Sequence, residues 1–173
     1  MALIVMVGYP YSGKSTFVDL LVKFYPEPST GGIHVVRPSD LYPQNIDEYE
    51  PTARTDYQIA AWEVAKEKAI DLLKNHDSET IVFDTCGANP YSIRGVIAMA
   101  NLRHHKTIAI WIATPRSVCR KRGSPTIVDK YIGKFEEAIR WYQVHFDKVI
   151  AVKNGPQSIL EWEERAKQIV GTL

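Results

Sequence analysis

Residues 8–16 constrain this chain most, because they form a glycine-rich loop between an apolar run and an amphipathic segment. The loop reads Gly-Tyr-Pro-Tyr-Ser-Gly-Lys-Ser-Thr and fits the pattern GxxxxGK[ST]. The apolar run Ala2 to Val7 precedes it, and residues 14–24 carry apolar side chains at three- and four-residue spacing. A strand that enters a helix through such a loop is typical of an α/β domain.

The same loop predicts a binding site for the phosphates of ATP. Gly8 and Gly13 permit backbone angles that turn the N–H groups of the loop inward. Lys14 begins the expected helix, so its ammonium lies beside the β- and γ-phosphates. The hydroxyl of Ser15 is placed to bind Mg²⁺ and that of Thr16 to contact the α-phosphate. ATP and Mg²⁺ are therefore the expected cofactors, and the expected nucleotide-binding residues in the loop are Gly8, Ser12, Gly13, Lys14, Ser15 and Thr16.

The rest of the chain alternates predicted strands and helices. Further strands are expected at 33–36, 80–84, 106–112 and 148–152, and further helices at 56–74, 129–145 and 156–170. Repeated βα units imply a parallel sheet with right-handed crossovers. We therefore expect a three-layer α/β fold with a five-stranded parallel sheet. With 173 residues, of which 45% are hydrophobic, the chain can build one core, so we expect a single domain over residues 1–173.

Charge and cysteine content restrict function only weakly. Lys and Arg number 21 and Asp and Glu 20, so the formal net charge of +1 neither requires nor excludes a nucleic-acid partner. Cys86 and Cys119 lie in different segments, which favours a reduced compartment. Residues 1–7 are too few for a membrane span and lack the charged start of a secretory leader. The expected location is the cytoplasm, without a membrane partner.

Two carboxylates are expected at the edge of the sheet that carries the loop. Asp84 ends a predicted strand, where it can hold a water molecule on Mg²⁺ or orient a group that binds the acceptor. Asp40 follows the strand at 33–36, where phosphoryl transfer needs a carboxylate to position the attacking hydroxyl and to accept its proton. The alternatives are a turn-capping role for Asp84 and a solvated loop acid or helix N-cap for Asp40.

A short basic segment follows the fourth predicted strand. Its basic residues are Arg116, Arg120, Lys121 and Arg122. The flanking proline and glycine predict a short helix inside a lid at about residues 115–125. Such a helix can close over ATP and neutralise charge on the transferred phosphoryl group. We expect Arg122 and Arg120 to be catalytic and Arg116 to contact the nucleotide; the alternative is an exposed basic helix.

These features favour a kinase over two other classes of phosphate-loop protein. A switch GTPase needs an NKxD motif, but the chain has Lys153 before Asn154. A motor ATPase usually has a glutamate after the aspartate that ends the apolar strand, but Asp84 is followed by Thr85. The small size, the proline in the loop and the later arginines are typical of a kinase. A nucleotide-binding module without kinase activity remains open.

The loop, Asp40, Asp84 and the arginine helix, in this order, resemble the kinase domain of phage polynucleotide kinase and its relatives. In that family the loop reads G-x-P-x-S-G-K-S-T, which residues 8–16 match. The family's general base, an aspartate after the second strand, falls on Asp40. Its Asp-Thr-Asn-x-Asn-Pro segment compares with Asp-Thr-Cys-Gly-Ala-Asn-Pro at 84–90, and its functional lid arginine falls on Arg122. The similarity spans roughly residues 4–131.

The resemblance implies a hydroxyl on nucleic acid as the acceptor, but two features differ from the family. The family's acceptor-side arginine falls on Pro43, so Arg37 or Arg54 is expected to replace it. The lid is also shorter and has no second arginine beyond residue 123. Related phage enzymes phosphorylate 5-hydroxymethyluracil in DNA, and this compact chain is similar to that subclass. Tyr42 begins a segment rich in proline and tyrosine that can stack a base, or that supplies ordinary loop aromatics.

The implied partner is therefore DNA, through either the 5-hydroxymethyl group of 5-hydroxymethyluracil or a 5′-hydroxyl end. The expected acceptor-binding residues are Arg37, Tyr42, Arg54, Asp84 and Asn89, and Ser15 and Asp84 are the expected metal-binding residues. A free nucleoside or nucleotide remains an alternative acceptor, which the near-neutral charge favours.

Overall fold

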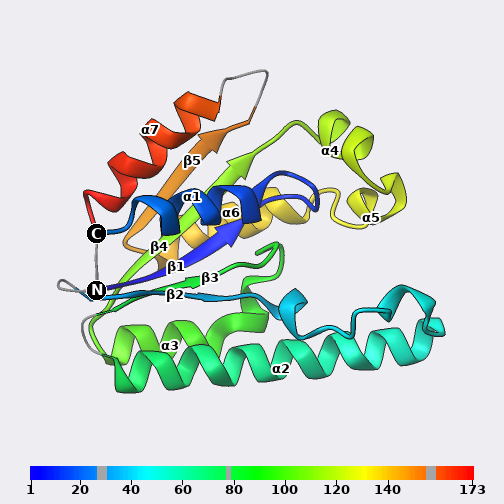
Figure 1. Cartoon of the computed structure of the whole chain (residues 1–173), viewed down its shortest axis with the longest axis horizontal. Helices are drawn as coiled ribbons and strands as arrows, with labels where there is room; N and C mark the ends of the chain where they lie inside the picture. Colours follow the sequence, from blue (N-terminus) through cyan, green and yellow to red (C-terminus); the bar gives the residue numbers. More distant parts are fainter. Residues whose placement is uncertain (27–30, 77–78, 155–158) are drawn as a thin grey trace.

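The computed structural model describes residues 1–26, 31–76, 79–154 and 159–173, and a sheet of five parallel strands forms its centre (Figure 1). The strands are β1 (Ala2–Val7), β2 (Ile33–Val36), β3 (Thr80–Phe83), β4 (Lys106–Ala113) and β5 (Lys148–Lys153), in the spatial order β2-β3-β1-β4-β5. Every residue of the central strand β1 is buried, which explains its continuous apolar run. The predicted five-stranded parallel sheet is confirmed.

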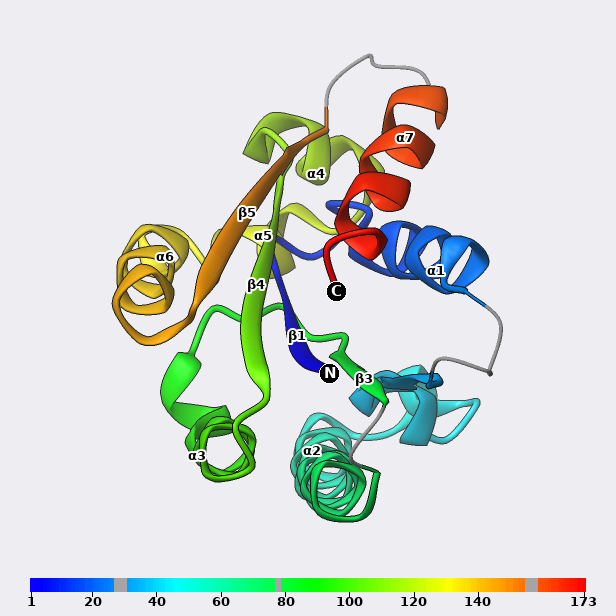
Figure 2. The same ribbon diagram turned by 90° about the vertical axis from the view of Figure 1, so that its left-hand side faces the viewer.

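Helices cover both faces of the sheet and complete the expected three layers (Figure 2). The helices are α1 (Lys14–Phe24), α2 (Pro51–Asn75), α3 (Arg94–Leu102), α4 (Arg116–Arg122), α5 (Pro125–Asp129), α6 (Lys134–His145) and α7 (Ile159–Val170). One apolar cluster joins α2, α3 and α6 to one face, and a second joins α1 and α7 to the other. Over the described ranges, none of the helices combines the length and the apolar character that a membrane span requires.

Two predicted helices have different boundaries in the structure. The helix expected at 129–145 is split, because α5 ends at Asp129 and α6 begins only at Lys134. Gly133 separates them with φ of +76°, a left-handed conformation that a continuous helix does not contain. The helix expected from residue 56 begins at Pro51 instead, since proline suits the first position of a helix.

Three further segments complete the comparison between the predicted and the observed elements. Helix α3 was not expected, because nine residues are too few for a clear periodic pattern. The start predicted for the last helix, Pro156, lies outside the described residues, and the described part runs over α7. The proline-rich stretch at 37–55 contains two short 3₁₀ helices, η2 (Pro38–Leu41) and η3 (Ile46–Glu48), and the first turn of α2.

Because the strands are parallel, their carboxyl ends meet at one edge of the sheet. The loop after β1 lies at this edge beside the segment after β3, and the backbone N–H of Gly8 donates to the carbonyl of Cys86 at 2.9 Å. Open α/β sheets bind ligands at this edge.

Candidate active site

Two glycines allow the loop after β1 to pass close to its neighbours. Gly8 has φ of +150°, and a Cβ added there would lie 2.9 Å from the carbonyl oxygen of Ile112. Gly13 has φ of +96°, and its added Cβ would lie 2.9 Å from the ring of Trp162. Any side chain at either position would therefore clash, which explains the two glycines of the motif. Tyr11, between them, also has positive φ, at 63°, a strained conformation typical of functional loops.

Buried hydrogen bonds support the loop from below. The carbonyl of Ser12 accepts one bond from the hydroxyl of Thr114 at 2.7 Å and one from Nδ2 of Asn154 at 2.6 Å. Both donors are buried and follow the ends of β4 and β5. Trp162 of α7 packs its ring against Gly13 and donates from Nε1 to the carbonyl of Lys153 at 3.1 Å. Sequence reasoning missed this support, although both polar residues stand at strand ends on the ligand-binding edge.

The side chain of Lys14 folds back onto the loop after β1. Its Nζ donates to the carbonyls of Gly8 at 3.1 Å and Tyr9 at 2.8 Å. Burial is the main influence on its pKa and lowers it, while negative charge on Cys86 and Asp84 acts in the opposite direction. The ammonium can exchange these carbonyls for phosphate oxygens without a large movement of the chain.

A cavity of about 440 Å³ lies over the start of α1. Its lining residues are Tyr11, Gly13, Lys14, Ser15, Thr16 and Arg122. We call it the phosphate cavity, because it joins the loop, the N-terminus of a helix and a lysine, the arrangement that binds phosphate. Arg122 comes from α4, so the structure brings the predicted lid arginine to the loop.

The other two arginines of α4 contact a different partner. Nε of Arg116 lies 3.6 Å and Nη2 of Arg120 3.7 Å from the carboxylate of Asp129. These contacts join α4 to α5, and neither arginine lines the phosphate cavity. A direct role for Arg116 or Arg120 in catalysis or nucleotide binding stays a prediction.

The end of α4 also touches the loop directly. A Cβ added at Gly123 would lie 2.3 Å from the ring of Tyr11, so the glycine allows the two segments to meet. This contact places α4 against the loop.

Asp84 belongs to a charged network that is centred on Arg37. The side chain of Asp84 is 3% exposed, and Oδ2 accepts from Nε of Arg37 at 2.8 Å. Arg37 also pairs with Asp19 of α1 at 2.6 Å. Arg37 therefore connects the end of β3 to α1. Arg37 does not line the larger of the two cavities at this edge, which is described below. Its predicted contact with the acceptor therefore stays a prediction.

Ser15 and Asp84 suit Mg²⁺ by their chemistry. A hydroxyl and a carboxylate are hard oxygen ligands, which Mg²⁺ prefers and supplements with water. Both residues line one cavity of about 730 Å³ at this edge of the sheet, to which the loop and the end of β3 contribute. The residues present therefore fit the expected ion by their chemistry, and their predicted roles, Ser15 as a direct ligand and Asp84 as a partner of a bound water, stay predictions.

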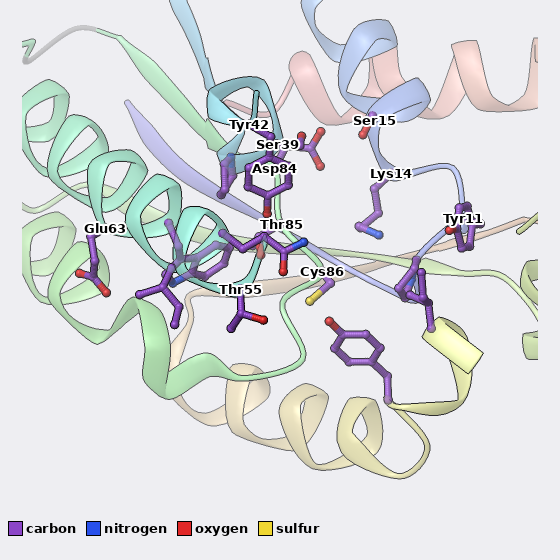
Figure 3. A pocket seen from close by; sticks show the side chains of 17 residues that line it. Tyr11, Lys14, Ser15, Ser39, Tyr42, Thr55, Glu63, Asp84, Thr85 and Cys86 are labelled. Atoms are coloured by element: carbon purple, nitrogen blue, oxygen red, sulfur yellow. The ribbon is translucent and has the colours of Figure 1, made fainter. Parts of the chain in front are cut away.

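A second, larger cavity of about 730 Å³ adjoins the first, and we call it the acceptor cavity (Figure 3). Lys14 and Tyr42 extend into it from different walls in Figure 3. Its walls come from the loop, η2, the N-terminal half of α2, the end of β3 and the segment after α5. Trp62 and Tyr131 add two further aromatic rings. Lys14, Ser15 and Tyr11 line both cavities, so the loop forms their common wall.

Two phenols of the acceptor cavity, those of Tyr42 and Tyr131, stay neutral at physiological pH because their pKa values are raised. Burial, together with the charge of Cys86 and a hydrogen bond between the two side chains, raises the pKa of Tyr131 to about 12. Burial also raises the pKa of Tyr42. Both rings can therefore pack against an acceptor while their hydroxyls donate hydrogen bonds.

The predicted general base, Asp40, and two predicted acceptor-binding residues, Arg54 and Asn89, are not among the residues that line this cavity. Asp40 is exposed in η2, whose neighbours Ser39 and Tyr42 do line the cavity. Arg54 donates to the carbonyl of Asp47 and lies 3.5 Å from its carboxylate. Asn89 lines two smaller cavities, of about 230 and 260 Å³, beyond Tyr131. The catalytic and binding roles of these residues stay predictions.

Sequence reasoning missed the aromatic walls that Trp62 and Tyr131 provide. In the sequence the two residues fall within the helices expected at 56–74 and 129–145, and no local signal singles them out. Their inward position depends on how α2 and the segment after α5 pack, and no local motif encodes that.

The parallel sheet, its strand order and the glycine-rich loop after the first strand define a P-loop kinase-like fold. The sequence profile of the family described as AAA domain (AAA_33) matches residues 3–125, so the chain belongs to this family. No curated protein sequence matches the chain.

Solved structures share this fold at low sequence identity. A gluconokinase from Sinorhizobium meliloti 1021 superposes with a TM-score of 0.61 at 15% identity, over 99% of this chain and 92% of that one. Kti12 from Chaetomium thermophilum, solved with ADP-AlF3, gives 0.66 at 11% identity, over 98% and 97%. Shikimate kinase from Aquifex aeolicus vf5 gives 0.56 at 22% identity, over 98% and 94%. At these identities the similarity establishes the fold alone.

Proposed function

We propose that the protein is an ATP-dependent kinase that transfers the γ-phosphate to a hydroxyl group. The observation that carries this proposal is the common wall of the two cavities. Lys14 and Ser15 face the phosphate cavity on one side and the acceptor cavity on the other. The γ-phosphate of an ATP molecule held there would lie beside the acceptor, which is the geometry that phosphoryl transfer needs.

Each residue of the site has its own role in the proposed reaction. The loop amides and Lys14 hold the phosphates in line, and Arg122 stabilises charge that spreads over the transferred group. Ser15 would bind Mg²⁺ and Asp84 would hold one of its waters. When bound, the ion neutralises charge on the β- and γ-phosphate oxygens. The acceptor oxygen forms a bond to the γ-phosphorus while the bond to the bridging oxygen of ADP breaks.

We assign to Asp40 the role of general base, which accepts the proton of the acceptor hydroxyl. The support is the resemblance to the polynucleotide kinases and the position of Asp40 in η2, whose Pro38 and Ser39 line the acceptor cavity. Asp84, the nearest alternative, is engaged by Arg37 and lies on the metal side.

For the acceptor we propose a hydroxyl on DNA, either the 5-hydroxymethyl group of 5-hydroxymethyluracil or a 5′-hydroxyl end. The rings of Tyr42, Trp62 and Tyr131 support a planar acceptor, because bases stack on aromatic side chains. A base in a duplex would have to be flipped out to enter the cavity.

A small-molecule acceptor, such as a free nucleoside or nucleotide, is the second candidate. The acceptor cavity, at about 730 Å³, lies within the range of small-molecule sites. The formal net charge of +1 also provides no overall attraction for a polyanion.

Labelled γ-phosphate ATP, offered with Mg²⁺ and a matched panel of acceptors, tests both candidates. The panel contains DNA with 5′-hydroxyl ends, DNA with internal 5-hydroxymethyluracil and blocked ends, and free nucleosides and nucleotides. Label on either DNA supports the DNA proposal and distinguishes its two forms. Label on free nucleosides or nucleotides alone identifies a small-molecule kinase, and ATP binding without labelling of any acceptor contradicts the proposed function.

A further inference from the structure

Three side chains from separate segments converge at the amino ends of β2 and β3, away from the active site. His34 belongs to the edge strand β2, His76 follows α2, and Glu79 precedes β3. Nε2 of His34 and Nδ1 of His76 each lie 2.6 Å from Oε2 of Glu79. The two imidazole centroids are 5.3 Å apart, and the three ligand-type atoms lie within 4.8 Å of one another.

We propose that His34, His76 and Glu79 bind a divalent transition-metal ion, with Zn²⁺ as the first candidate. Two imidazole nitrogens and one carboxylate oxygen form a common set of three protein ligands for Zn²⁺, and water completes the tetrahedron. The side chains are 37%, 40% and 23% exposed, so solvent reaches the cluster. Softer ligand sets would favour other metals, whereas imidazole suits Zn²⁺, Cu²⁺ and Ni²⁺.

The cluster needs only a small adjustment to hold the ion. With bonds of about 2.0–2.2 Å, ligand atoms around tetrahedral Zn²⁺ lie about 3.3–3.6 Å apart. The present nitrogen-to-oxygen distances of 2.6 Å would therefore open by about 0.7–1.0 Å, within the reach of side-chain torsions.

The carboxylate is already held in position. A Cβ added at Gly32 would lie 3.4 Å from Oε1 of Glu79, so the carboxylate lies against the backbone there. The N–H of Thr80 donates to the carbonyl of Gly32 at 2.8 Å, which joins the segments before β2 and β3. A bound ion would add the end of α2 to this connection. The site involves neither ATP nor the acceptor, so the proposal stands independently of the proposed function.

Metal titration of the tag-free, nucleotide-free protein tests the site. Co²⁺ serves as the spectroscopic probe, because its visible absorption reports tetrahedral coordination, and Zn²⁺ is titrated by calorimetry. We expect one ion per chain in the wild type. His34→Ala and His76→Ala should each lower the affinity at least tenfold, since even changes around metal ligands cost about 10–100-fold. His145→Ala, which removes an exposed imidazole on α6, should leave the affinity unchanged.

Absence of stoichiometric binding in the wild type would overturn the proposal and leave a hydrogen-bonded cluster. Equal affinity in the wild type and in the double variant His34→Ala/His76→Ala would also overturn it. Thermal unfolding provides a second readout if one variant folds poorly. Zn²⁺ at about a hundredfold over its dissociation constant should raise the melting temperature of the wild type by about 5–10 °C. The more conservative Glu79→Gln should lose most of that rise, and an equal rise in both proteins would contradict the assignment.

Discussion

The phosphate cavity and the acceptor cavity share a wall but are built from different kinds of contact. The phosphate side rests on backbone geometry, since two glycines permit close approach and buried donors from Thr114 and Asn154 fix the carbonyl of Ser12. The acceptor side is built from side chains of several segments, among them the first half of α2, where residues 55–60 are all exposed. We therefore expect the α2 wall of the acceptor cavity to adapt more readily than the loop, because exposed side chains have few buried contacts to hold them.

The largest expected effect is on the phosphate side. Lys14→Ala should lower the turnover number by about a thousandfold or more, because it removes a charge that stabilises the transferred phosphoryl group. Label transfer measures the rate, and circular dichroism confirms that the fold is retained. Lys68→Ala, an exposed residue of α2, is the matched control. Substantial turnover in Lys14→Ala would show that the phosphate side is not the rigid catalytic half.

The second-largest effect is expected at Asp40, the residue assigned to accept the proton of the acceptor hydroxyl. Asp40→Asn should lower the turnover number by about a hundred- to ten-thousandfold, because the acceptor hydroxyl loses its proton acceptor. The same substitution at the exposed Asp56 of α2 serves as the control. Near-normal turnover in Asp40→Asn would refute its role as general base. A comparison with Asp84→Asn would then show whether Asp84 accepts the proton instead.

A smaller effect is expected in the acceptor wall. Trp62→Ala should raise the Michaelis constant for the acceptor by about 5–150-fold, the equivalent of 1–3 kcal/mol of lost stacking. The constant for ATP should change little, because Trp62 lines the acceptor cavity and not the phosphate cavity. Trp62→Phe should recover part of the acceptor affinity. Equal changes for both substrates would contradict the division of the site into two halves.

The smallest effect concerns the support beneath the loop. Asn154→Ala should lower the free energy of unfolding by about 1–3 kcal/mol, since a buried hydrogen bond to Ser12 is lost. For a chain of this size, each kcal/mol lowers the melting temperature by about 2–4 °C. Thermal unfolding with and without ATP measures both stability and nucleotide binding. The exposed Asn101→Ala should leave both unchanged, and an equal loss in the two variants would refute the supporting role.

The sequence predicted the phosphate side better than the acceptor side, for a physical reason. Gly8, Gly13 and Lys14 are required by local backbone geometry and charge, so their spacing alone reveals them. Asp84 and Arg122 could be predicted because strand ends and a short capped helix have local signals. Trp62 and Tyr131 could not, because their inward direction depends on the packing of distant segments. The break at Gly133 was not predicted either. Apolar residues on both sides continue the helical periodicity and so conceal one residue with a left-handed conformation.

The wall shared by Lys14, Ser15 and Tyr11 has a thermodynamic consequence. Whatever occupies one cavity alters the surface offered to the other, so the two binding equilibria are linked. Linkage is reciprocal, and the factor by which ATP changes affinity for the acceptor must equal the factor by which the acceptor changes affinity for ATP. Tyr11 is well placed to transmit this cooperativity, because its ring lies against Gly123 at the end of α4.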